Sequence, residues 1–438
     1  MDSRNSCLKY FERPEVAELV SAKLAAGLEL RLFQTFLRDP RGSGVNPFET
    51  MDRKKDPQAA AKEGRFVAVK WLVNCMKLAP EELDWLYFSR ICSSAASGGH
   101  LEILKWLRRN RCNWDSDTCT EAAGGGRLEI LKWLRKNKCP WDSDTCSSAA
   151  GNGHLKVLKW LRRNKCPWDS WTCSLAAGEG HLEILQWARR NGCHWCEVTC
   201  SEAAGGGHLD CLEWAIDNGC ECSEWTCAEA AGEGHLNVLQ WARERGCPWD
   251  KYTCSRAAQG GHLEILQWAR ENGCDWAEDT CASAALCGHL EVLRWARENG
   301  CPWDSDTCAS AAKGAHLEIL KWLRDHGCPW DELASAGAAE RGHLNVLMWL
   351  RENGCPWDER TCSEAARPGH LLCLMWLREN GCPWDSLTCF RAAQGNHLEV
   401  LQWARERGCP WDKRTCYEAG LVGHLELLRW ARENGCPE

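Results

Sequence analysis

The sequence is poor in several features, and each shortage excludes a class of protein. Only 15 of its 438 residues are proline, which excludes a collagen-like or proline-rich disordered chain. No run of 18 apolar residues is present, so no membrane-spanning helix is expected. The opening residues include no apolar stretch typical of a secretory signal. We therefore expect a folded chain in the cytoplasm, with the nucleus left open and no membrane association.

Tyrosine and phenylalanine are also scarce, with 4 and 7 residues, whereas tryptophan and cysteine are abundant, with 28 and 32. Such an imbalance indicates a repeated motif that carries tryptophan and cysteine. Inside the cell the cysteines are expected to be reduced thiols rather than a disulfide framework. The formal net charge of −8 argues against nucleic-acid binding.

The repeat becomes visible when the chain is aligned on its Gly-His-Leu triplets. Thirteen units follow one another with a strict period of 27 residues and without insertions. The shared pattern is G-H-L-E-I-L-K-W-L-R-E-N-G-C-P-W-D-x-x-T-C-x-x-A-A-x-G. A fourteenth, degenerate unit precedes them around residues 59–72.

Each unit is expected to contain two antiparallel helices. The stretch from His to Asn has apolar residues one, three, four and seven places after the His, which indicates an amphipathic helix. A glycine such as Gly273 can end this helix in a left-handed conformation. In three early units Arg or Lys replaces that glycine, and the preceding Asn is expected to take the left-handed conformation instead.

The other helix of the unit is shorter and is expected to begin at Thr-Cys. A Glu three residues after the Thr, as at Thr361 and Glu364, matches the capping-box signature. The Ala-Ala pair would let the next helix approach closely. A pair of helices this small cannot bury its apolar faces alone, so stacking of neighbouring units must supply the core.

The string T-C-x-x-A-A-x-G-G-H-L-E-I-L-K-W-L-R-x-N-G-C resembles the ankyrin repeat. It shares with that family a Thr that opens a short helix, an Ala-Ala pair, Gly-His-Leu-Glu and a leucine-rich second helix ending at Gly. Ankyrin units have 33 residues, and C-P-W-D-x-x stands here where that family has a projecting β-hairpin. The resemblance implies an all-α solenoid of stacked helix pairs, and protein partners as a class.

Most repeated columns are interpreted as framework. The two tryptophan columns and the two cysteine columns are expected to pack in the core. The spacing of Cys and His does not suit a zinc site, because the two would lie roughly 18 Å apart along a helix. The His is expected to hydrogen-bond the backbone of a neighbouring unit. The Arg eight residues after it is expected to pair with the Asp of its own turn over the Trp ring. No catalytic group, cofactor site or metal site is expected.

Function is expected where the units differ. The position before the Thr is the most variable, and four consecutive units carry apolar or aromatic residues there. In ankyrin-like stacks this place faces the concave side, and exposed aromatic residues are typical of binding hot spots. The candidate partner-binding residues are Trp171, Val198, Trp225 and Tyr252.

These observations divide the chain into three expected parts. Residues 1–57 form an N-terminal helical segment, a linker and a cap, residues 58–99 a degenerate first repeat, and residues 100–438 thirteen ankyrin-like repeats. The expected function is that of a non-catalytic scaffold that binds a protein partner on its concave face. Two alternatives stay open, a thiol-rich redox or metal-buffering protein and a substrate adaptor for a ubiquitin ligase. The chain is expected to be a monomer or to associate weakly head to tail.

Overall fold

The computed structural model describes residues 57–77 and 85–437, and these residues form 28 α-helices and no β-strand. The expected N-terminal segment lies outside the described residues as far as residue 56. None of the described helices is long and apolar enough to cross a membrane.

The chain falls into two compact units, one ending at Trp114 and the other beginning at Asp115. The shorter unit contains α4 (Pro57–Lys62), α5 (Phe66–Lys77), α6 (Trp85–Gly98) and α7 (Leu101–Arg109).

The longer unit contains α8 to α31, in which two kinds of helix alternate along the chain. The even-numbered helices carry the Thr-Cys and Ala-Ala motifs: α8 (Ser116–Gly124), α10 (Ser143–Gly151), α12 (Ser170–Gly178), α14 (Glu197–Gly205), α16 (Glu224–Gly232), α18 (Lys251–Gly260), α20 (Thr280–Cys287), α22 (Ser305–Lys313), α24 (Glu332–Glu340), α26 (Glu359–Ala366), α28 (Ser386–Gln394) and α30 (Lys413–Val422).

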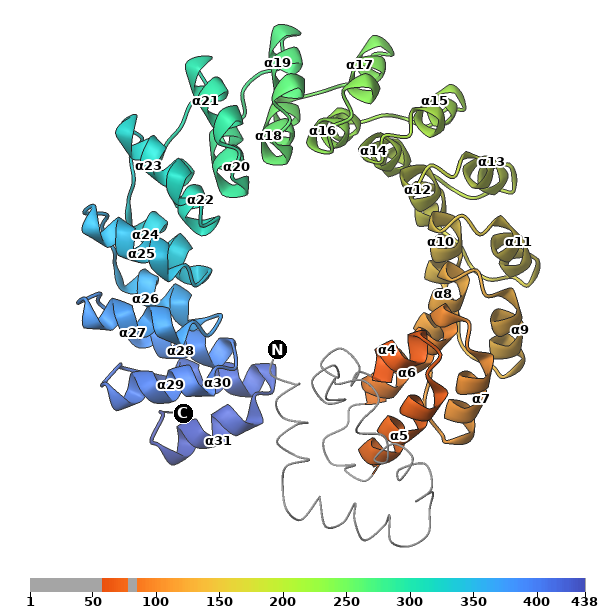
Figure 1. Ribbon diagram of the computed structural model, residues 1–438, viewed down its shortest axis with the longest axis horizontal. Coiled ribbons are helices and arrows are strands. Elements are labelled where there is room, and N and C mark those ends of the chain that lie inside the picture. Colours follow the sequence, from red (N-terminus) through yellow and green to blue (C-terminus); the bar gives the residue numbers. More distant parts are fainter. Residues whose placement is uncertain (1–56, 78–84, 438) are drawn as a thin grey trace, which may run out of the picture. The chain divides into compact units, whose positions relative to one another are not determined.

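The odd-numbered helices follow the Gly-His pair of each unit: α9 (Leu128–Lys136), α11 (Leu155–Arg163), α13 (Leu182–Arg190), α15 (Leu209–Asp217), α17 (Leu236–Glu244), α19 (Leu263–Glu271), α21 (Leu290–Glu298), α23 (Leu317–Asp325), α25 (Leu344–Glu352), α27 (Leu371–Glu379), α29 (Leu398–Glu406) and α31 (Leu425–Glu433). Along most of the longer unit, the even-numbered helices form an inner row and the odd-numbered helices an outer row (Figure 1).

The inner row is held together by small side chains. Each even-numbered helix packs closely on the next one, for example α16 on α18 and α18 on α20. Ala257 and Ala258 of α18 are fully buried, as is the Ala-Ala pair of most other inner helices. Because alanine projects little from the helix, neighbouring backbones can approach closely. The expected role of the Ala-Ala pair is therefore confirmed.

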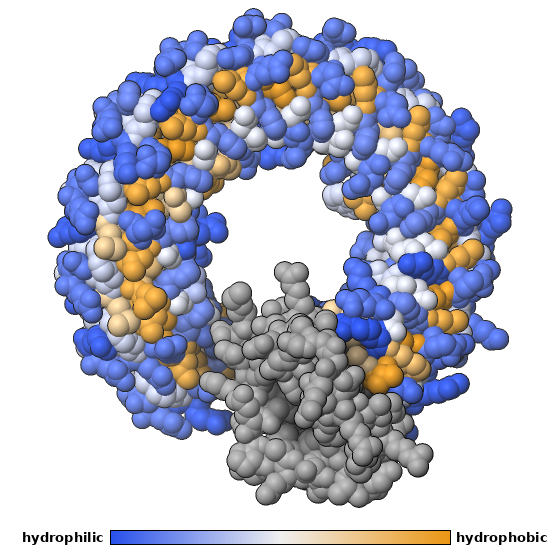
Figure 2. Space-filling model, in the orientation of Figure 1, coloured by the Kyte–Doolittle hydropathy of each residue, from blue (hydrophilic) through white to orange (hydrophobic). Residues whose placement is uncertain are grey.

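The outer row is held together by tryptophan and arginine. Adjacent outer helices approach one another less closely than inner ones, and indole rings fill the space between them. The ring of Trp249 has the Arg243 guanidinium of α17 over its face, 4.3 Å from the centroid. Its edge meets Trp268 of α19 at a centroid distance of 5.8 Å and an interplanar angle of 66°. The same Arg-Trp-Trp arrangement recurs in most units, and hydrophobic residues run in a band along the unit in Figure 2.

The arginine of this column lies over the Trp ring as expected, but it does not pair with the turn's Asp in the units where its polar partner is seen. Nη1 of Arg297 donates to the carbonyl oxygen of Cys301 at 3.2 Å. The carboxylate of Asp304 in that turn instead accepts the Asp306 backbone N–H at 3.1 Å. The Asp is therefore occupied as a helix cap.

Most inner helices begin earlier than the sequence indicates, because the residue three places before the Thr, usually Asp, is their N-cap and the Thr is their third residue. An exception is α20, which begins at Thr280. In α26, Oδ1 of Asp358 accepts the Arg360 N–H at 3.1 Å, and the Asp358 N–H donates to Oγ1 of Thr361 at 3.4 Å. The expected capping box of Thr361 and Glu364 is therefore wrong. The position before the Thr lies inside the helix, as its second residue.

The turn after each outer helix was predicted correctly where it contains glycine. Gly273 has a φ of +85°, in the left-handed region. Where glycine is replaced, however, Arg111, Lys138 and Lys165 take positive φ values of 60°, 63° and 63°. The preceding Asn stays right-handed, so the expectation that Asn would take the strained conformation is wrong. Asn137 instead donates its side-chain amide to the carbonyl oxygen of Trp133 at 2.8 Å.

The histidine column connects neighbouring units, as expected. Nε2 of His154 lies 2.9 Å from the carbonyl oxygen of Gly124, at the end of the preceding inner helix. Its ring also covers Gly126, where a Cβ would come within 2.8 Å of the imidazole. Glycine is required there both for its φ of +69° and for this close approach.

Candidate functional site: the inner groove

The four candidate residues occupy the second position of four consecutive inner helices, α12, α14, α16 and α18. Trp171, Trp225 and Tyr252 are 51%, 53% and 46% exposed, and Val198 is half-buried. Half-exposed aromatic side chains differ from the framework tryptophans of the longer unit, such as Trp249 and Trp268, which pack between outer helices. This position therefore differs from the framework columns in exposure as well as in sequence.

Trp225 and Tyr252 form an exposed aromatic pair across neighbouring helices. Their rings are stacked with centroids 6.4 Å apart and an interplanar angle of 12°. The Tyr252 backbone is fixed by the N-cap Asp250, whose carboxylate accepts its N–H at 3.0 Å. The stack thus presents a joined aromatic surface on a rigid helix start.

Trp171 belongs to a separate part of the same row. Its N–H is likewise held by the N-cap Asp169, at 3.1 Å. Its side chain borders a surface hollow that we call the aromatic hollow, lined by Thr120, Asp144, Ser147, Ser148, Gly151, Asn152, Trp171, Leu175 and Glu179. The structure therefore joins two of the four predicted residues in one stack and places Trp171 at a hollow of its own.

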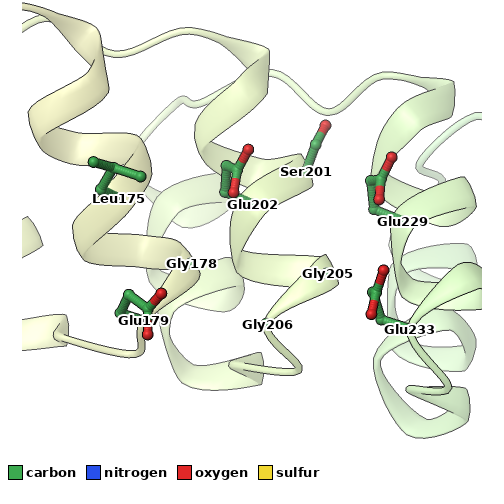
Figure 3. A pocket seen from close by; sticks show the side chains of 9 residues that line it. All are labelled: Leu175, Gly178, Glu179, Ser201, Glu202, Gly205, Gly206, Glu229 and Glu233. Carbon is green, nitrogen blue, oxygen red and sulfur yellow. The ribbon is translucent and has the colours of Figure 1, made fainter. Parts of the chain in front are cut away.

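A second hollow of about 230 Å³ lies next to the first and is lined by acidic residues (Figure 3). The two hollows share Leu175 and Glu179 of α12, so they form a continuous inner groove across α8 to α16. This acidic hollow is lined by Leu175, Gly178, Glu179, Ser201, Glu202, Gly205, Gly206, Glu229 and Glu233.

Glycines at the ends of the inner helices give the acidic hollow its shape. A Cβ on Gly178 would lie 3.3 Å from Cβ of Glu202, and one on Gly205 would lie 3.4 Å from Cβ of Glu229. The first distance is tighter than an ordinary contact, and the second is at the lower limit of one. The glycines thus leave room for the glutamates of the next helix to lie over the helix end.

The charge in the acidic hollow is only partly neutralised. Nη2 of Arg256 lies 2.6 Å from Glu229 and 4.0 Å from Glu233. No ion pair seen among the described residues involves Glu179 or Glu202. Burial raises the pKa of Glu202 above its usual range, and the negative charges of Glu229 and Glu179 raise it further. The hollow therefore favours a positively charged group that would relieve this repulsion.

The four glutamates were not among the predicted site residues. Glu179 and Glu233 belong to the G-E-G-H-L turns of their units. The signal that could have found the site is the presence, in three consecutive units between residues 172 and 234, of a Glu in G-E-G, in T-C-x-E or in both.

The groove offers chemistry suited to recognition. It presents carboxylates, hydroxyls and aromatic faces along one row of helices. No group of three or more His, Cys, Asp or Glu residues that could hold a metal ion occurs in the part of the chain that the structure describes.

Comparison with known proteins yields no family model and no curated protein that matches the chain. Among solved structures, it is similar to the human ASB11 ankyrin repeat domain, with 18% identity and a TM-score of 0.29, over 36% of this chain and 84% of that one. It is also similar to the pentatricopeptide repeat protein PPR10 in complex with an 18-nt psaJ RNA element. That match has 15% identity and a TM-score of 0.26, over 92% of this chain and 80% of that one.

The described helices themselves define the class. They form an all-α solenoid of consecutive packed helix pairs, so the fold prediction is confirmed. The part of the chain that the structure describes is therefore a helical-repeat protein.

Proposed function

We propose that the chain is a non-catalytic scaffold that binds a protein partner on its inner row of helices. The contact residues are Trp171, Val198, Trp225 and Tyr252, together with the inner groove beside them. The proposal extends to the location, which we take to be the cytoplasm or the nucleus, and to a monomer or a weak head-to-tail assembly.

The observation that carries this proposal is the exposure of three aromatic side chains on one row. Framework tryptophans such as Trp268 lie between outer helices, whereas Trp225 and Tyr252 stack on each other in solvent. Aromatic side chains held on a rigid element give much contact area at little entropic cost, which is why they dominate binding hot spots.

Charge supports a partner with basic residues. The acidic hollow places Glu179 and Glu202 beside Leu175, and these glutamates join no ion pair seen among the described residues. A Lys or Arg of the partner would lower the electrostatic cost of burying Glu202. We therefore propose a partner segment that combines basic and apolar side chains. Electrostatic complementarity of this kind affects mainly specificity and the association rate.

The test compares native-lysate pulldowns of the wild type and two variants, read by mass spectrometry. The first variant combines Trp171→Ala, Trp225→Ala and Tyr252→Ala, and the second combines Glu202→Gln and Glu233→Gln. We expect the first to lose the partner. We expect the second to retain it weakly and with a smaller dependence on salt.

A matched control removes exposed apolar side chains of the outer row, with Leu372→Ala and Leu425→Ala, which are 73% and 69% exposed in the wild type. Circular dichroism must give the same helix content for all proteins. If a partner is lost only from the first variant, the inner row is the binding surface. If the aromatic variant keeps every partner that the control keeps, the proposal is wrong.

A further inference from the structure

Counted from an inner helix through the outer helix and turn that follow it, all but one of the units carry two cysteines that are twenty residues apart in sequence. One lies in the first turn of the inner helix, after the Thr, and the other lies in the turn that follows the outer helix. Both columns are buried, with Cys254 and Cys274 as an example at 0% and 1% exposure. The sequence predicts both columns as core residues. The structure places each cysteine of one column close to a cysteine of the other.

The thiols of a unit lie close together, because the turn cysteine donates to the carbonyl oxygen of the N-cap residue of the helix that carries the other cysteine. In most units a hydrogen bond between the two side chains also shifts their pKa values. These hydrogen-bonded pairs are Cys146 with Cys166, Cys173 with Cys193, Cys200 with Cys220, Cys254 with Cys274, Cys281 with Cys301, Cys308 with Cys328, Cys362 with Cys382, Cys389 with Cys409, and Cys416 with Cys436.

One unit lacks the inner cysteine, and its Ser shows how close the side chains at the two positions lie. Ser335 stands at the inner position, and its Oγ lies 3.6 Å from Sγ of Cys355, its partner twenty residues on. A disulfide requires a sulfur separation of about 2.05 Å, so a Cys pair in this arrangement would have to close by roughly 1.5 Å. Rotation of the two side chains can supply a movement of this size.

The backbone holds both cysteines in place. Cys254 is part of α18, and the thiol of Cys274 donates to the carbonyl oxygen of Asp250, the N-cap of the same helix, at 3.2 Å. The equivalent bond joins Cys166 to Asp142 at 3.4 Å. The turn cysteine is thus anchored beside the first turn of the inner helix before any reaction.

We propose that these pairs are sites of reversible disulfide formation within each unit, with a peroxide as the oxidant. The thiolate of one cysteine attacks the O–O bond of hydrogen peroxide, forms a sulfenic acid and releases hydroxide. The second thiol attacks that sulfur, so an S–S bond forms, the S–O bond breaks and water leaves. Two thiols are oxidised and one peroxide is reduced to two waters. A small dithiol reverses the step by thiol–disulfide exchange.

Electrostatics favours ionisation of one thiol in several pairs, but not always of the same column. The hydrogen bond from Cys254 lowers the pKa of the Cys274 thiol below its usual value, against the opposing effect of burial, and Arg270 lowers it further. The same interaction raises the pKa of Cys254. In the next pair but one the order is reversed, with the pKa of Cys308 lowered and that of Cys328 raised. In each of these pairs the thiol with the lowered pKa is the attacking one. Although Cys274 itself is buried, its chain neighbours Gly273 and Asp275 are exposed, so a small oxidant has little protein to cross.

The test uses the full-length wild-type protein, treated in the folded state with hydrogen peroxide. Remaining thiols are alkylated, and the protein is digested without reduction and mapped by mass spectrometry. We expect linked peptides to join cysteines twenty residues apart, such as Cys254 and Cys274, with helix content unchanged by circular dichroism. Cys355, which faces Ser335, and Cys373, which is buried in α27, should be recovered alkylated.

Two variants sharpen the test. Ser335→Cys is expected to add a link to Cys355, and Cys254→Ser is expected to leave Cys274 alkylated while the other links persist. Two results would overturn the proposal. One is that every pair stays reduced in the folded protein and links only after unfolding in urea. The other is that the links join different units at random.

Discussion

The inner and outer rows of helices are packed by side chains of very different size. Inner helices meet through Ala-Ala pairs, so their backbones lie close and their first turns remain open to solvent. Outer helices lie farther apart and are joined by large rings, with Arg over Trp and Trp against Trp. The role of a Trp in this molecule therefore depends on the row of helices in which it lies. An outer Trp is structural, whereas an inner Trp such as Trp225 is free to serve recognition.

The strongest test of this contrast applies one substitution to both rows. Trp268→Ala removes a wedge between outer helices, and we expect it to lower the free energy of unfolding by about 2–3 kcal/mol, since the ring is partly buried. Trp225→Ala removes an exposed ring, and we expect a loss below about 1 kcal/mol. Urea titration followed by circular dichroism measures both. Equal losses would contradict the assignment of the two rows to different tasks.

A second test enlarges alanine in both rows. Ala257→Leu fills the close contact between inner helices, and we expect it to destabilise the protein by about 1–3 kcal/mol through overpacking. Ala269→Leu alters an equally buried alanine of α19, at a position where other units carry leucine, such as Leu107 and Leu134. We expect its effect to stay below about 1 kcal/mol. The melting temperatures of the two variants decide the matter, and a reversed order would refute close inner packing.

A third test removes the arginine that lies over the Trp ring between two outer helices. Arg270 lies 4.5 Å from the centroid of the Trp276 ring and donates to the carbonyl oxygen of Cys274. Arg270→Gln should cost about 1 kcal/mol, because it removes a cation–π contact and a charged hydrogen bond. Lys321→Gln is the control, since it removes an exposed ion pair with Glu318 and no cation–π contact seen among the described residues. Similar urea midpoints for the two variants would show that the guanidinium adds nothing to the wedge.

The smallest expected effect is a pH dependence of the contacts between units. Burial lowers the pKa of His343 below its usual 6.5, and the positive charges of His370 and Arg341 lower it further, while its bond to the Lys313 carbonyl raises it. The neutral ring is therefore favoured in the fold. Its stabilising contribution is present above about pH 6.5 and is lost as the pH falls through the lower folded-state pKa. Melting temperatures of wild type and His343→Gln should converge between pH 7.5 and pH 5, and a constant difference would contradict this.

Much of this architecture could be predicted because the same residue pattern recurs in thirteen units. The His contact between units and the Arg over the Trp ring follow from a fixed spacing of 27 residues. The start of the inner helix could not be predicted so well, since Thr-x-x-Glu and Asp-x-x-Thr both match capping patterns one turn apart. Only the observed bonds of Asp358 and Thr361 decide between them.

The site was predictable only in part, because it depends on the distance between side chains of different helices. The variable column identified Trp171, Val198, Trp225 and Tyr252 as candidates, and the exposure of the three aromatics fits that interpretation without testing what they bind. The stack of Trp225 on Tyr252 requires the spacing of α16 and α18, which the sequence alone does not contain. The groove of glutamates likewise depends on how Gly178 and Gly205 admit the next helix.

The placement of the cysteine pairs has a mechanical consequence. A unit of 27 residues that unfolds under tension would lengthen by up to about 95 Å at roughly 3.5 Å per residue. If its two cysteines were joined, the nineteen residues between them would be held in a closed loop. Only seven residues per unit, or about 25 Å, would then be free to extend. Oxidation of the pairs would thus sharply reduce the length by which the chain can extend under tension. It would do so without adding a bond between any two units.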